Sequence, residues 1–155
     1  MKKLLFILFL GATFSLQAQN FSEIKKTKMT TLEEYQAQND NVLECARYIL
    51  DRSISEISIT KKGICTKFIF EWMTGIDITF NLDETMSKLT KGDTDRMVVY
   101  LAAMAVAALE DPDNKPSAEE ITERAKELFL DYAEDEDNNL KLNRYIKKQL
   151  KARKK

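Results

Sequence analysis

A helical repeat of apolar residues runs along most of the chain and constrains its fold more than any other feature. Between Thr31 and Leu150 the apolar residues recur three or four positions apart in successive segments, which places them on one face of an α-helix. Only four of the 155 residues are Gly and two are Pro, so few positions interrupt these helices. The pattern predicts an all-α fold, a single small bundle of about five to six helices.

Residues that favour helix ends divide this repeat into segments. Thr31 to Glu34 and Ser117 to Glu120 match the capping box, a sequence pattern that begins helices. Asp83 is expected to cap a brief helix, and Gly75 is expected to end another in the left-handed conformation. The expected helices cover 31–52, 64–75, 83–92 and 94–110. One more helix begins at Ser117, and the last contains residues 142–150. Residues 53–62 are expected to connect the first two helices.

The period changes between residues 76 and 82. Ile76, Ile78, Phe80 and Leu82 alternate with polar residues there, and an alternation of two is typical of extended chain. One segment of this length cannot form a sheet alone. We expect one short extended segment near 76–82.

The first residues match a secretory leader. Lys2 and Lys3 precede the apolar run Leu4–Leu10, and Leu16–Ala18 is a plausible cleavage site. The pattern predicts a signal peptide over 1–18. The alternative is a membrane anchor, but the apolar run falls short of the roughly 20 residues that cross a bilayer.

Cleavage after Ala18 would leave residues 19–155 as a single α-helical domain, with 19–30 as a loose lead, in an exported protein that is periplasmic or secreted. The leader takes two of the 24 basic residues with it, so the formal charge changes from −1 to −3 and gives no reason to expect a nucleic acid partner. The most apolar later stretch, Met97–Leu109, reaches only about 20 Å as a helix. We therefore expect no transmembrane span after signal cleavage.

The residue types exclude several kinds of catalytic site. The chain has no His, which removes His-based nucleophile activation and His-ligated zinc, and two Cys cannot make a four-thiolate centre. Asp135, Asp137 and Asn139 imitate the start of a calcium loop, but Leu140 and Ile146 stand where that loop needs Gly and Glu. We expect no metal and no cofactor, which leaves carboxylate chemistry or a non-catalytic role.

Cys45 and Cys65 fall in consecutive expected helices of an exported chain, where disulfides persist. A bridge between them would close a loop of about 20 residues and stabilise the fold by roughly 3 kcal/mol. We expect this disulfide. The alternatives are two unpaired buried thiols or a reactive thiol.

Two charged rows lie near the C-terminus. Acidic residues recur every four positions in one helix. In the last helix, basic residues recur at spacings that alternate between three and four positions. An antiparallel hairpin turning near 137–139 would pair the rows. The alternatives are solvated faces or a basic amphipathic helix that binds anionic lipid or a partner. The residues expected to pair are Glu123, Glu127 and Asp131 with Arg144, Lys148 and Lys151.

A possible binding groove surrounds the Gly75 helix end. Aromatic residues could form its floor and carboxylates its rim, so that it holds a peptide or glycan. Glu71 paired with Asp83 could alternatively carry out acid–base chemistry, or the segment could simply cover the core. The residues of the expected groove are Trp72, Met73, Asp77, Phe80 and Asp83.

The segments Lys67–Gly75 and Tyr100–Met104, with Phe80 between them, resemble a family of uncharacterised exported helical proteins of Bacteroidetes-type bacteria. The leader ending at Gln17–Asn20 fits the same family, and the resemblance covers about residues 62–110. This family has no known activity, so the resemblance implies export and an all-helical fold and assigns no functional residue.

These features predict an exported, periplasmic helical protein that works by binding or as a structural domain, with an unknown protein, peptide or glycan as its partner. Two other functions remain open. One is a periplasmic immunity or inhibitor protein that buries an anchor residue in a toxin's active cleft. The other is a carboxylate-based hydrolase, which needs two acids about 5 to 9.5 Å apart.

Overall fold

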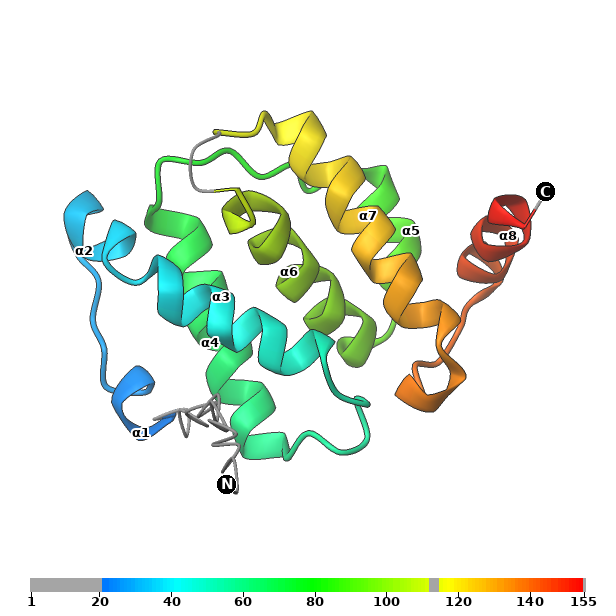
Figure 1. Cartoon of the computed structure of the whole chain (residues 1–155), viewed down its shortest axis with the longest axis horizontal. Helices are drawn as coiled ribbons and strands as arrows, with labels where there is room; N and C mark the ends of the chain where they lie inside the picture. The colour runs from blue at the N-terminus through cyan, green and yellow to red at the C-terminus, as the bar shows by residue number, and fades with distance from the viewer. Residues whose placement is uncertain (1–20, 112–114, 155) are drawn as a thin grey trace, which may run out of the picture.

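The computed structural model of the protein describes residues 21–111 and 115–154. All of the secondary-structure elements in these ranges are helices (Figure 1). No strand occurs within these ranges, which confirms the all-α fold, and the eight α-helices in them exceed the five to six expected. The predicted leader lies outside the described residues. The helices are α1 (Phe21–Ile24), α2 (Leu32–Gln36), α3 (Asn39–Leu50), α4 (Ile59–Gly75), α5 (Glu84–Thr90), α6 (Thr94–Leu109), α7 (Ala118–Glu134) and α8 (Arg144–Arg153), with a 3-10 turn, η1 (Glu136–Asn138).

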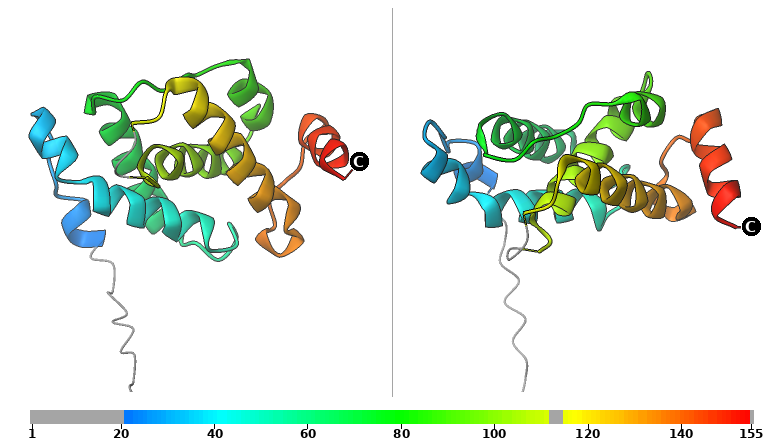
Figure 2. Two further views of the ribbon diagram at one scale, coloured as in Figure 1. Left: turned by 45° about the horizontal axis from the view of Figure 1, so that its top comes forward. Right: turned by 90° about the horizontal axis from the view of Figure 1, so that it is seen from above.

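The Ala-rich helix α6 forms the centre of the bundle. Helices α3, α4, α5 and α7 pack around it (Figures 1 and 2), and every residue from Val98 to Ala108 is buried. Small side chains such as Ala102 and Ala105 let the neighbouring helices approach closely, so that the large core residues Trp72 and Phe129 can be enclosed completely. No helix within 21–111 or 115–154 is long and apolar enough to cross a membrane.

Local signals placed several helix starts correctly. Both capping boxes form, at Thr31 and at Ser117, and the Asp83 side chain accepts a hydrogen bond from the Met86 N–H at the start of α5. The connector at 53–62 is shorter than expected because Ser58 caps α4, whose helix therefore begins at Ile59. The expected helix 31–52 is wrong as one element, since it breaks between α2 and α3.

Gly75 has a different role from the one expected. The chain leaves α4 through Ile76 with φ −78°, and positive φ occurs among the described residues only at Gly92 and Asn139, so the left-handed cap is wrong. A Cβ at position 75 would collide with the aromatic ring of Tyr35. Gly75 therefore makes room for the Tyr35 ring where α2 approaches the end of α4.

The segments flanking the bundle are also ordered. Residues 76–83 run without regular secondary structure, in agreement with an isolated extended segment. The expected loose lead is wrong over the part that is described, because Ile24 and Met29 are buried in the core and α1 packs on α4. The hydrophobic core therefore reaches from α1 to Ile146 of α8.

Tyr100 should be replaceable by Phe with a gain in stability. Its hydroxyl is buried in α6 without a hydrogen-bond partner among the described residues, whereas the Tyr132 hydroxyl donates to the Arg52 carbonyl at 2.8 Å. Because an unpaired buried hydroxyl is costly, we expect Tyr100→Phe to raise the free energy of unfolding by about 1 kcal/mol at neutral pH. Urea denaturation would measure it, and a loss of more than about 1 kcal/mol would contradict it.

The same phenol groups should make the fold sensitive to alkali. Burial raises the pKa of Tyr100, and burial raises that of Tyr132 to about 12. Unfolded phenols ionise near pH 10 while these folded ones stay neutral. The free energy of unfolding is therefore unaffected by their ionisation below about pH 10 and falls as pH rises from there through the folded pKa values. Tyr100→Phe should therefore lose less stability than the parent chain between about pH 10 and 12.

Candidate functional site

An elongated apolar groove lies between α4, the 78–82 segment, α5 and α6. Its volume is about 940 Å³. It follows α4 from Ile59 to Met73, which are fifteen residues that extend over about 21 Å of helix. Its apolar side chains are Ile59, Phe70, Met73, Ile78, Phe80, Leu82, Met86, Met97, Val98 and Leu101.

The groove gathers the exposed apolar side chains of the molecule. Four large apolar residues are exposed in the described part of the chain, and three of them line this groove: Ile59 at 86%, Leu82 at 70% and Phe70 at 55% exposure. The fourth, Leu32, is 40% exposed and lies in α2. Contiguous exposed apolar surface of this kind usually marks an interaction site.

Three methionines, Met73, Met86 and Met97, supply part of the groove wall. Their unbranched thioether side chains adopt many rotamers and contact partners of irregular shape, and such residues are frequent on surfaces that bind varied partners. The other two described methionines, Met29 and Met104, are buried in the core. Met86 is also buried in the core, whereas Met73 and Met97 are partly exposed, so Met73 and Met97 form the adaptable part of the groove wall.

Gly63 leaves the middle of α4 open to the groove. A Cβ at this position would have no atom within 4 Å. A helix-interior Gly costs about 1 kcal/mol relative to Ala, and no neighbouring side chain requires it here. The missing side chain gives a ligand access to the helix backbone.

The polar groups at the rim are largely engaged within the protein. Lys62 Nζ lies 2.6 Å from Asp95 Oδ1, and the Thr66 and Thr74 hydroxyls donate to carbonyls of their own helix at 2.7 Å. Lys67, which has no carboxylate in ion-pair contact within the described residues, faces both this groove and an adjoining hollow. That hollow also carries Lys25, Lys26 and Lys28, and Glu71 is its one carboxylate.

Of the five residues expected to form a groove, Met73 and Phe80 do line this one. Trp72 does not, because it is fully buried in the core, where its Nε1–H donates to Asn39 Oδ1 at 3.0 Å and its ring meets Phe80 edge to face. Asp77 lines a separate hollow of about 460 Å³ beside Lys115 Nζ, 3.9 Å away. Asp83 is the cap of α5.

The carboxylates of this region are therefore not brought together. Asp77, Asp83 and Glu71 line three different hollows, and no group of three acidic or cysteine residues gathers as a metal site in the described part of the chain. The acid–base pairing of Glu71 with Asp83 gains no support from this arrangement.

Sequence reasoning missed Ile59, Phe70 and Leu82. A signal was present, since α4 carries apolar residues on more than one face: Phe68 and Ile69 are buried while the adjacent Phe70 is exposed. A helix that carries apolar residues outside its core-facing side has a second apolar face, which a partner can cover.

Cys45 and Cys65 are free, fully buried thiols in the structure. A hydrogen bond with Cys65, followed by burial, raises the pKa of the Cys45 thiol, which disfavours a reactive thiolate. Helices α3 and α4, which carry the two residues, pack on one another, as a bridge between them would require. The disulfide stays a prediction.

The acidic row of α7 is neutralised within the chain, but not by the residues expected. Glu127 and Asp131 pair with Arg153 at 3.0 and 2.6 Å, and Glu123 pairs with Lys126 of its own helix at 2.9 Å. The pairing of this row with Arg144, Lys148 and Lys151 is wrong. Those three side chains are exposed and have no carboxylate in ion-pair contact among residues 21–111 and 115–154.

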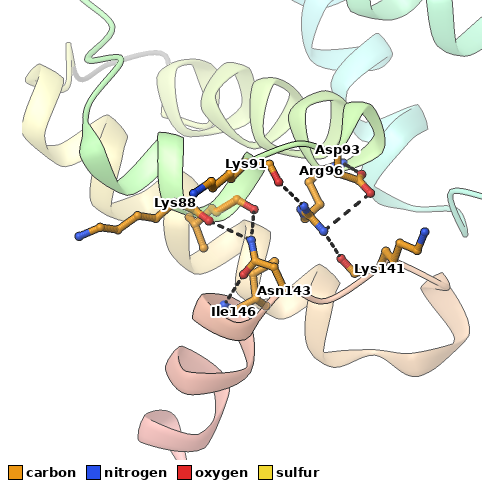
Figure 3. A network of polar contacts seen from close by, with 8 residues as sticks. Lys88, Lys91, Asp93, Arg96, Lys141, Asn143 and Ile146 are labelled. Carbon is orange, nitrogen blue, oxygen red and sulfur yellow. Dashed lines mark hydrogen bonds and ion pairs between the residues drawn. The ribbon is translucent and has the colours of Figure 1, made fainter.

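A polar network fixes the position of α8 (Figure 3). The buried Arg96 guanidinium donates to the carbonyls of Lys141 at 2.6 Å and Lys91 at 2.5 Å, beside Asp93. Asn143 caps α8 through the Ile146 N–H and donates to the Lys88 carbonyl at the end of α5. The segment before α8 is thus held by the buried Arg96 and by Asn143 rather than by the charged rows.

Comparison with models of protein families, with curated protein sequences and with solved structures found no match. The resemblance to exported helical proteins therefore remains an expectation.

Proposed function

We propose that this protein is an exported, non-catalytic binding protein whose groove takes the apolar face of an amphipathic helix from a partner. The observation that carries the proposal is the convergence of Ile59, Phe70 and Leu82 on one groove. Burying each such side chain contributes about 1.5 to 3 kcal/mol. A partner that covers all three would supply enough apolar contact for specific binding.

The shape and chemistry of the groove favour a helix over a glycan. A glycan needs many unpaired hydrogen-bonding groups, whereas the rim residues Lys62, Thr66 and Thr74 already have partners. The length of about 21 Å fits roughly four turns of helix, and helix-in-groove recognition uses apolar anchors at this spacing. Gly63 allows close approach.

The positive charge beside the groove indicates which charge to expect on the partner helix. Lys67 lies at the border, and Lys25, Lys26 and Lys28 line the adjoining hollow with a single carboxylate. A partner helix with acidic residues along the flank above that hollow would be complementary in charge, which favours encounter and orientation.

Methyl NMR of methionine tests this function directly. The probe is a synthetic helical peptide of about four turns with a leucine stripe and a glutamate flank, compared with a scrambled peptide of the same composition. We expect the amphipathic peptide to shift the methyl signals of Met73, Met86 and Met97. The signals of Met29 and Met104 in the core serve as internal controls and should stay in place.

Matched variants identify the surface. Phe70→Ser and Leu82→Ser should each weaken peptide binding about tenfold or more, since each removes an anchor, while Leu32→Ser alters the exposed apolar residue outside the groove and should leave binding unchanged. Equal binding of both peptides, or shifts confined to other residues, would refute the proposal.

A further inference from the structure

The outer face of α8 carries a row of basic residues. At 100° per residue, Arg144, Lys147, Lys148 and Lys151 fall within an arc of about 100°, and all four are exposed. The opposite side of the helix holds Ile146, which is fully buried. The row therefore faces solvent while the helix is docked through its other side.

The charge of this row is not neutralised by the fold. Arg153 points inward and pairs with Glu127 and Asp131, and Lys154 pairs with Glu134 at 3.0 Å. These contacts use Glu127, Asp131 and Glu134 of α7. Within the described ranges, no ion pair involves the four outer residues.

The helix also lies at one end of the molecule. Figures 1 and 2 show α8 at one end of the bundle, with α1 and α2 at the other. None of the large apolar residues exposed in the described chain lies on α8. A convex row of cations without apolar anchors lacks what the centre of a protein interface requires, but it suits an extended anionic surface.

We propose that the outer face of α8 binds the surface of an anionic phospholipid bilayer. The apolar side of α8 is already engaged in the bundle through Ile146, so the helix lies on the headgroups without inserting. The attraction is then electrostatic, reversible and weakened by salt. Each basic residue near such a surface strengthens binding about fivefold. This surface is independent of the apolar groove.

Vesicle co-sedimentation of the predicted mature chain, residues 19–155, which contains every described residue, tests the proposal. We expect binding to vesicles of phosphatidylglycerol mixed with phosphatidylcholine, release by high salt, and no binding to phosphatidylcholine alone. K147Q/K148Q/K151Q should weaken the binding about a hundredfold. These side chains are exposed, so circular dichroism should show an unchanged fold.

The matched control is K25Q/K26Q/K28Q, which removes the same charge from exposed lysines at the other end of the molecule and should bind vesicles as the parent chain does. Equal loss in both variants would show that total charge rather than α8 is responsible and would overturn the proposal. Failure to bind the anionic vesicles would overturn it as well. Equally tight, α8-dependent binding to duplex DNA or to an acidic protein would replace the bilayer by a different polyanion.

Discussion

Arg96→Met is expected to lower the free energy of unfolding by about 3 kcal/mol. Arg96 is 6% exposed, and its guanidinium donates to the carbonyls of Lys91 and Lys141, which are far apart in the sequence. Removing it leaves these carbonyls without their charged donor and leaves Asp93 without its cation. Urea denaturation measures the loss.

The same change should loosen the C-terminal helix before the rest of the fold. Because Arg96 holds the segment that leads into α8, we expect faster hydrogen exchange from residue 140 to residue 150 in Arg96→Met. Arg96→Lys should recover little, since one ammonium cannot span two carbonyls as a planar guanidinium does.

Arg153→Gln is the matched control, because it removes the ion pairs with Glu127 and Asp131, which are partly exposed. Such pairs contribute at most about 1 kcal/mol, so this variant should keep α8 protected. If Arg153→Gln instead released α8 while Arg96→Met did not, the charged rows would be what docks the helix.

What could be predicted from the sequence follows the range of the interactions involved. The caps at Thr31, Asp83 and Ser117 depend on residues three positions away, and the sequence pattern identified all of them. The role of Gly75 depends on the ring of Tyr35, forty positions earlier, so its local pattern indicated a cap that does not form. Local signals could not show this contact.

The charged rows show the same limit for helix orientation. A basic residue of the last helix does neutralise part of the acidic row of α7, but the spacing of the rows indicated other residues. The partner is Arg153 because the angle of α8 is set by the η1 turn, by Asn139 at φ 56° and by the Arg96 network, none of which periodicity describes. The basic residues displaced from the pairing are three of the four that form the outer face of α8.

The groove was only half predictable for a related reason. Apolar periodicity identifies a residue as one that avoids water, but it does not say whether the fold or a partner covers it. Met73 and Phe80 lie in the groove as expected, whereas Phe70, two positions before Trp72, is exposed there and Trp72 is enclosed. Only the packing of α3 and α6 on α4 separates these cases.

Trp72→Ala is expected to lower the free energy of unfolding by about 4 kcal/mol, a larger loss than that of Arg96→Met. The indole is fully buried, so its removal leaves a large cavity in addition to the lost apolar contact. It also leaves the Asn39 side chain without the N–H that it binds at 3.0 Å. Chemical denaturation followed by circular dichroism measures the loss.

Milder variants separate the packing of Trp72 from its hydrogen bond. Asn39→Ala should cost about 1 to 3 kcal/mol because the indole N–H stays buried without an acceptor, and Trp72→Phe should cost less than Trp72→Ala. Once Trp72→Phe has removed the indole N–H, the further change Asn39→Ala should cost less than it does in the parent chain. Additive losses would show that the two side chains act independently.

Trp72→Phe also tests whether Trp72 lies in the core or on the floor of the groove. If Trp72 lay on the groove floor, the variant would weaken binding of the amphipathic peptide and leave stability almost unchanged. Because the indole lies behind the groove wall, we expect the reverse: reduced stability, with the Met73, Met86 and Met97 methyl signals responding to the peptide as they do in the parent chain. A loss of binding without a loss of stability would return Trp72 to the binding surface.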